Sequence, residues 1–113
     1  MRPFRAKDRK VWRAWLRANH KKEKEVWLLQ LKKHVTDEES VSYNHAMEEA
    51  LCYGWIDGME RRIDDRTHMV RFSPRRPKSN LSASNVERIE RLIKQKKMTK
   101  AGLEALAHVW PPR

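Results

Sequence analysis

The densest group of side chains with binding chemistry lies between residues 71 and 88, around two prolines. Guanidinium groups bind phosphate through paired hydrogen bonds, and the free N–H groups at a helix start also favour anions. Ser84-Asn-Val-Glu87 predicts such a start, because a serine followed three residues later by glutamate forms a capping box. The candidate anion-binding residues are Arg71, Arg75, Arg76, Lys78, Ser79, Ser82, Ser84 and Arg88. An equally supported interpretation is a solvated loop whose serines only cap the helix.

Gly54-Trp-Ile-Asp-Gly58 defines a second candidate, a pocket formed by Trp55, Asp57 and His68. Trp55 would form its wall and Asp57 would anchor a ligand. The structural alternative is that Gly54 ends a helix, Trp55 fills the core and Asp57-Gly58 kinks a strand. We favour the structural interpretation for Trp55 and leave the role of Asp57 open.

The remaining reactive side chains favour a non-enzymatic protein without a cofactor, a bound metal or catalytic residues. Cys52 is predicted near the end of a helix, where the dipole disfavours a thiolate, so we expect an inert, buried thiol. A small metal-assisted hydrolase is the weak alternative, because carboxylates between Asp57 and Asp65, together with His68, are ligand types that Mg²⁺ uses. Their spacing matches no metal-binding motif, and turn formation already explains Asp64 and Asp65.

Apolar periodicity and capping residues predict the elements that position these groups. Asp8, Ser42 and Thr99 can each cap a helix, with a further helix beginning at Ser84. Strands are predicted at 26–31, 55–63 and 67–73, the last two as a hairpin, although a turn at 57–58 would divide the first of them. We therefore predict one α+β domain over residues 1–113, in which an antiparallel sheet of about three strands packs against about four helices.

The net charge of +11 indicates an anionic partner, either a nucleic acid or other polyanion, or an acidic protein. Residues 1–34 and 66–113 each carry +9, whereas residues 35–65 carry −7. The acidic segment either neutralises its neighbours or forms a negative pole, and the sequence supports both interpretations equally. No apolar run is long enough to span a membrane. A single cysteine and a start without a signal sequence predict a cytoplasmic location.

Several motifs occur in an order that resembles the YdeI/OmpD-associated family, also described as bacteriocin-protection proteins. They are Trp15-Leu-x-x-Asn-His20, Val26-Trp-Leu28 with Lys32-Lys33, Ala50-Leu-Cys-Tyr-Gly-Trp-Ile-Asp-Gly58, Arg71-Phe-Ser-Pro-Arg-Arg-Pro-Lys-Ser79 and Met98-Thr-x-x-Gly102. The resemblance covers about residues 4 to 107 and implies a bacterial cytoplasmic protein loosely linked to stress or peptide resistance. It supplies no catalytic residues. Leu81 departs from the tryptophan usual in that family, and relatives commonly continue beyond the position of Arg113.

Together these features predict a non-enzymatic protein that binds a phosphate-bearing or nucleic-acid partner through a basic loop. The alternative is a protein-interaction or stress-protection factor that does not bind nucleic acid. Salt dependence separates the two, because phosphate contacts weaken steeply as ionic strength rises.

Overall fold

The computed structural model of the protein describes residues 2–77 and 80–111. Along the chain the elements are α1 (Arg9–Asn19), β1 (Val26–Leu31), α2 (Tyr43–Cys52), β2 (Trp55–Arg62), β3 (Thr67–Pro74), α3 (Ala83–Lys94) and α4 (Lys100–Ala105). The predicted α+β class, with a three-stranded antiparallel sheet and helices, is confirmed.

Three of the helices begin where the capping residues predict. The side chains of Asp8, Ser42 and Thr99 accept hydrogen bonds from backbone N–H groups in the first turns of α1, α2 and α4. The prediction for α3 is wrong: the helix begins at Ala83, and Ser82 rather than Ser84 is its cap. Ser82 has the extended backbone that a cap requires, and its Oγ accepts from the N–H of Asn85 at 3.2 Å.

The sheet has the strand order β1-β3-β2, with β3 in the centre. Asp57 lies opposite Phe72 and Glu60 lies opposite Val70, so β2 holds one residue more than β3 between these pairs. Gly58 and its neighbour therefore form a β-bulge. Of the two alternatives that the sequence left open for 57–58, the strand is kinked there and is not divided by a turn. On the outer edge of β1, Phe4 donates to Trp27 O at 2.7 Å and accepts from Leu29 N at 2.8 Å.

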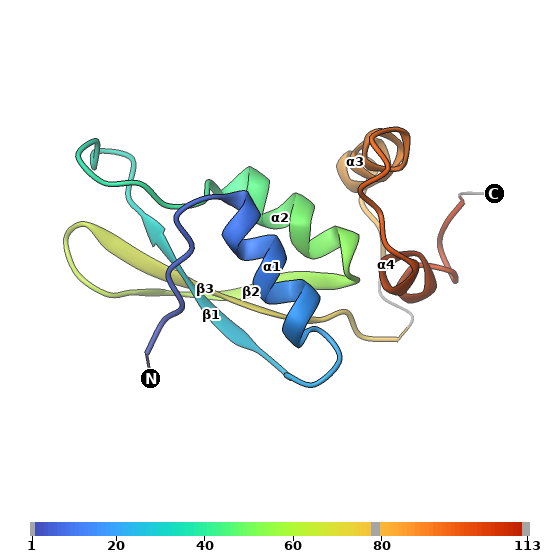
Figure 1. Ribbon diagram of the computed structural model, residues 1–113, viewed down its shortest axis with the longest axis horizontal. Coiled ribbons are helices and arrows are strands. Elements are labelled where there is room, and N and C mark those ends of the chain that lie inside the picture. The colour runs from blue at the N-terminus through green and yellow to red at the C-terminus, as the bar shows by residue number, and fades with distance from the viewer. Residues whose placement is uncertain (1, 78–79, 112–113) are drawn as a thin grey trace.

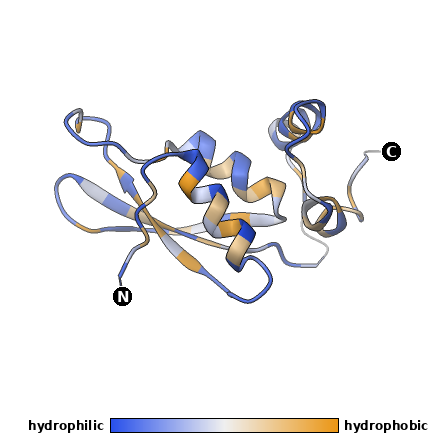
Figure 2. Cartoon of the chain, in the orientation of Figure 1, coloured by the Kyte–Doolittle hydropathy of each residue, from blue (hydrophilic) through white to orange (hydrophobic). Residues whose placement is uncertain are grey.

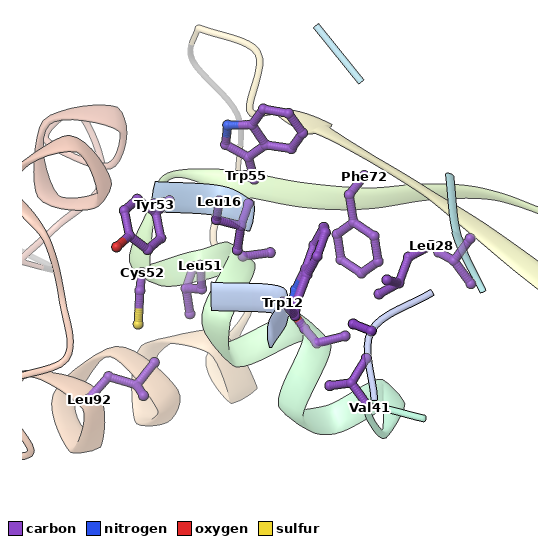
Figure 3. Packing of buried hydrophobic residues seen from close by; sticks show 14 of the residues in the cluster. Trp12, Leu16, Leu28, Val41, Leu51, Cys52, Tyr53, Trp55, Phe72 and Leu92 are labelled. Atoms are coloured by element: carbon purple, nitrogen blue, oxygen red, sulfur yellow. The ribbon is translucent and has the colours of Figure 1, made fainter. Parts of the chain in front are cut away.

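The hydrophobic core lies between the sheet and the first two helices (Figure 3). The Trp12 ring lies 5.2 Å from that of Phe72, which places α1 over the face of the sheet that Phe72 shares with Leu28 and Val70. The large buried side chains of the core include Trp12, Leu28, Leu51, Trp55, Phe72, Ile89 and Leu106. Trp15 is partly buried and stacks on Trp12.

The molecule is elongated, with extents of 44 × 26 × 23 Å. Figure 1 shows α1 and α2 side by side over the sheet, and α3 and α4 together beyond the last turn of α2. On β1 and β3, the side chains that alternate with the core positions, including Trp27, Leu29 and Met69, point to the opposite face. Only one face of the sheet therefore forms the core with these helices.

Candidate functional site

The serines before α3 mainly serve the helix start. Ser82 Oγ accepts from Asn85 N, and Ser84 Oγ lies within hydrogen-bond distance of Ser82 Oγ at 3.2 Å. The other predicted hydroxyl, Ser79, lies outside the described residues, as does Lys78. Capping therefore accounts for Ser82, and Ser84 contacts the capping hydroxyl.

The cations between residues 71 and 88 divide into paired and exposed groups. Arg71 Nε donates to Glu25 Oε2 at 2.9 Å, on the face of the sheet opposite α1 and α2. Arg88 Nη1 donates to Asn85 Oδ1 at 3.1 Å. Arg76 is exposed and has no ion-pair partner among residues 2–77 and 80–111. Within this segment, Arg76 is the described cation best placed to meet an external anion.

Arg75 holds the segment against the start of β2. Its backbone N–H donates to Gly54 O at 3.0 Å, and its Nη2 donates to Asn80 O at 2.8 Å. The side chain is buried, and this burial lowers the pKa of Arg75 despite the nearby Asp57 carboxylate. A guanidinium in this position supports the loop and is poorly placed to bind a polyanion.

A second basic segment lies at the same end of the sheet. Val26 at the start of β1 pairs with Phe72 near the end of β3, so the turn before β1 and the chain after β3 leave the sheet together. The turn is hydrophilic (Figure 2), and Lys21, Lys22 and Lys24 in it are exposed without an ion-pair partner in the described part of the chain. We use the term basic end for Arg17, Lys21, Lys22, Lys24 and Arg76.

Asp37 and Glu38 of the acidic segment lie at the other end of the sheet, where arginines from outside the segment pair with them. Arg66 forms ion pairs with Asp37 and with Glu38, and Arg5 Nη2 lies 3.0 Å from Glu38 Oε1. The bonds from Arg66 lower the pKa of both carboxyl groups. For Asp37 and Glu38, the structure favours neutralisation over a negative pole.

The core-facing side of the sheet becomes polar towards that same end. The register places Gln30, His68 and Arg62 in one row there, with Glu60 beside Val70. His68 Nδ1 and Glu60 Oε1 are in contact as an ion pair, without the alignment of a hydrogen bond. These residues border a cavity of about 1270 Å³, which we call the cleft. Its other walls are the first turns of α1 and α2 and the loop 32–42.

The structure does not bring Trp55, Asp57 and His68 together as a pocket. Trp55 is only 2% exposed and lies in the core, whereas His68 borders the cleft. Asp57 accepts a hydrogen bond from Tyr43 Oη at 2.5 Å. Partial burial and this bond raise the pKa of Tyr43 to about 12, so its hydroxyl remains a donor. The sequence-based pocket therefore contributes one residue, His68, to the cleft.

Sequence reasoning missed most of the cleft, including Gln30 and Tyr43, whereas Glu60 was considered only with His68 in the weak metal-site alternative. Gln30 offered a signal, because it is the one polar residue in the apolar strand Val26–Leu31 and is only 4% exposed. Tyr43 and Glu60 belong to different elements that meet only after the sheet has formed. Their proximity follows from the register and could not be derived from spacing along the chain.

Two buried carboxylates on α2 form a second polar cluster that the sequence did not reveal. Glu49 is 1% exposed and lies between Arg9 and Arg13, whose Nη1 approaches Glu49 Oε1 to 2.8 Å. Glu48 contacts Arg9 at 2.9 Å and also pairs with Arg91 of α3. Each carboxylate is saturated by cations of this chain, so the cluster connects three helices and offers no open position for a ligand.

Cys52 lies in the last turn of α2 and is buried, as predicted. Burial raises the pKa of its thiol, and the neighbouring Glu49 acts in the same direction, whereas Arg13 opposes them. In Figure 3 the side chain sits among core residues close to Leu51 and Tyr53. Its environment is that of a structural thiol and not of a nucleophile.

The described part of the chain contains neither a metal-binding cluster nor a membrane-spanning helix. No group of three or more His, Cys, Asp or Glu side chains there is arranged to hold a metal ion. No helix there is long and apolar enough to cross a membrane.

Fold and site thus define a small, basic α+β domain with a cationic end and a separate cleft. The family DUF8412, described as a domain of unknown function, matches residues 4–105, and the chain belongs to this family. No curated protein and no solved structure matches the chain.

Proposed function

We propose that this protein is a non-enzymatic binding module whose basic end contacts the phosphate groups of a nucleic acid or a similar polyanion. The observation that supports the proposal is the distribution of unpaired charge. Asp37 and Glu38 of the middle segment are matched by cations, whereas the five cations of the basic end have no ion-pair partner in the described part of the chain. Clustered, exposed cations attract a polyanion and displace its condensed counterions.

The same arrangement favours contact with a charged backbone over recognition of bases. The cations come from the last turn of α1, the turn that follows it and the segment after β3. Trp12 and Trp55 are buried in the core, so neither offers an exposed platform for base stacking. We therefore expect weak dependence on base sequence and strong dependence on salt.

The experiment is a titration of a fluorescently labelled DNA duplex, followed by anisotropy at several salt concentrations. Lys22→Ala and Arg76→Ala each remove one cation of the basic end. Lys33→Ala is the matched control, because Lys33 is also exposed and without an ion pair in the described residues, but follows β1 at the opposite end. Loss of one phosphate contact should lower the slope of log affinity against log salt by about one for the first two variants only.

Equal, small losses in all three variants would show that the attraction is diffuse and would contradict a defined basic end. Absence of DNA binding by the unmodified protein would favour the alternative, a protein-interaction or stress-protection factor. Arg75→Ala is not used as a test, because this side chain supports the loop.

The sequence supports a cellular context for this binding module. The resemblance to the YdeI/OmpD-associated family supports a bacterial, cytoplasmic protein with a role in stress, and the buried single cysteine is compatible with a reducing compartment. The resemblance rests on motifs, and the structure gives several of these motifs packing roles. It therefore supports a cellular context for the protein and does not support a particular chemical activity.

A further inference from the structure

The cleft at the opposite end of the sheet has the size and lining of a small-molecule site. Its volume of about 1270 Å³ exceeds the range of roughly 300–1,000 Å³ typical of ligand pockets, so a ligand could enter without rearrangement of the walls. Apolar side chains from the sheet and the adjoining loop provide one part of the lining: Val35, Val41 and Val70. Such a surface suits a ring or a short hydrocarbon chain.

Gln30 gives the cleft a fixed polar group. Its Nε2 donates to Val41 O at 2.9 Å and to Leu29 O at 3.2 Å, which holds the amide in one orientation. Its Oε1 has no hydrogen-bond partner in the described part of the chain and is available to an N–H or O–H of a ligand. Gln30 Oε1 is not enclosed by protein atoms, so water or a ligand can reach this acceptor.

The acidic side chains that line the cleft already contact other groups of the chain. Glu39 lies 3.9 Å from Lys7 Nζ, and Glu60 contacts His68. Asp8 accepts from the N–H of Val11 at 3.0 Å as the cap of α1.

The remaining charge of the lining is positive. Lys33 lines the cleft and has no ion-pair partner within residues 2–77 and 80–111. The positive ends of the dipoles of α1 and α2 border the same space, since both helices begin there. The unpaired Lys33 and the dipoles of the two helices therefore favour a negatively charged ligand.

We propose that the cleft binds a small organic anion, with its apolar body on the valine surface, its anionic group near Lys33 and a hydrogen-bond donor facing Gln30. This site does not depend on the function proposed for the basic end. The two lie at opposite ends of the sheet and use different residues.

The probe for this site is 8-anilinonaphthalene-1-sulfonate, whose rings, sulfonate and N–H match the three features of the cleft. Binding is followed by its fluorescence, and ¹H–¹⁵N NMR spectra locate it on the protein. We expect shifts of the Gln30 side-chain amide and of the Val35, Val41 and His68 backbone signals. Shifts confined to the open sheet face around Leu29 and Met69, or no binding, would overturn the proposal.

Two variants test the assigned roles. Lys33→Ala should weaken binding of the probe about tenfold, as expected for one charge-assisted hydrogen bond. Val35→Asp places a negative charge on the apolar surface of a loop and should weaken binding by at least as much. A thermal melt checks that each variant is folded.

The matched control is Lys22→Ala, which changes net charge equally at the basic end. It should leave probe binding unchanged, and an equal loss from Lys22→Ala and Lys33→Ala would contradict the site. The same pair of variants gives the reverse result with DNA if the basic end binds phosphate. The DNA assay and the probe assay therefore test the two proposals separately, and either proposal can fail while the other stands.

Discussion

At the residue scale, two of the motifs that carry the family resemblance meet at the end of α2. Thr99 donates to Cys52 O from its backbone N–H at 3.1 Å and from its hydroxyl at 2.5 Å. Its hydroxyl oxygen also caps α4 by accepting from Gly102 N. A Cβ on Gly102 would lie 2.2 Å from Cys52 O, so only glycine permits this approach. The motif Met98-Thr-x-x-Gly102 is thereby explained by packing.

We predict that Gly102→Ala destabilises the protein by about 1–3 kcal/mol, the usual cost of forcing extra volume into a packed site. The atom that the new methyl group meets belongs to the backbone, which cannot rotate away. Gly58→Ala is the matched control, because its Cβ would meet only Arg71 O at an ordinary 3.6 Å. Urea denaturation should show a lowered midpoint for Gly102→Ala alone, and an unaltered midpoint would refute the close contact.

The second prediction at this scale concerns the thiol. Burial and the raised pKa of Cys52 predict slow modification by a disulfide reagent in native buffer. Labelling should be complete within the mixing time in denaturant. Rapid labelling of the native protein at neutral pH would mean that the end of α2 opens readily or that the thiolate is stabilised.

At the element scale, Glu48 and Glu49 determine how three helices are held together. Arg9 and Arg13 reach these carboxylates from α1, and Arg91 reaches Glu48 from α3. Burial acts to raise the pKa of Glu48, but the hydrogen bonds from Arg91 and Arg9 outweigh it and hold the pKa below the ordinary value of 4.5. A carboxyl group whose pKa falls on folding makes stability depend on pH.

We predict that Glu48→Gln lowers the free energy of unfolding at neutral pH by about 1–2 kcal/mol, because charge-assisted hydrogen bonds are lost. The contribution of Glu48 is complete above its ordinary pKa of 4.5 and disappears as pH falls through the lower pKa of the folded state. The gap between variant and unmodified protein should therefore close in acid. Urea denaturation across this pH range measures it.

Glu104→Gln provides the control for that experiment, since Glu104 is largely exposed and lies 3.9 Å from Lys100. The free energy of unfolding of the Glu104→Gln variant should match that of the unmodified protein at every pH. If the gap for Glu48→Gln stayed constant in acid, the ionised form of Glu48 would not be what stabilises the helices.

The elements themselves could largely be predicted, since their signals are local. Asp8, Ser42 and Thr99 each cap through a backbone group three residues away, and the alternation of 67–73 marked a strand. The start of α3 was missed because Ser82 and Ser84 offer the same chemistry two residues apart, and only the backbone geometry selects one. The last helix ends at Ala105, and Leu106 reaches the core from the turn that follows.

The candidate sites were harder to predict, because their chemistry depends on contacts between distant residues. Arg75 resembles its neighbour Arg76 in sequence, but only Arg75 is buried, through bonds to Gly54 O and Asn80 O. The cleft requires the pairing of Gln30 with His68 across two strands. Neither arrangement leaves a spacing pattern along the chain.

At the scale of the whole molecule, the parts at the two ends of the long axis differ in how extensively they are packed. The sheet, α1 and α2 share the aromatic core, whereas α3 and α4 contact mainly α2 at one end (Figure 1). Ile89 and Leu92 are the fully buried side chains of α3. Regions with fewer buried contacts open at lower free energy than the core, so α3 should unfold before α1, α2 and the sheet.

The last prediction tests this order by native-state hydrogen exchange. Backbone amides of α3 should exchange faster than those of the central strand β3, and Arg91→Ala should accelerate α3 further while leaving β3 unchanged, because the ion pair to Glu48 is lost. Lys94→Ala removes the same charge from α3 at a side chain that makes no ion pair in the described part of the chain, and it should have little effect. Equal protection of α3 and β3 in the unmodified protein would instead show that the whole molecule opens as one cooperative unit.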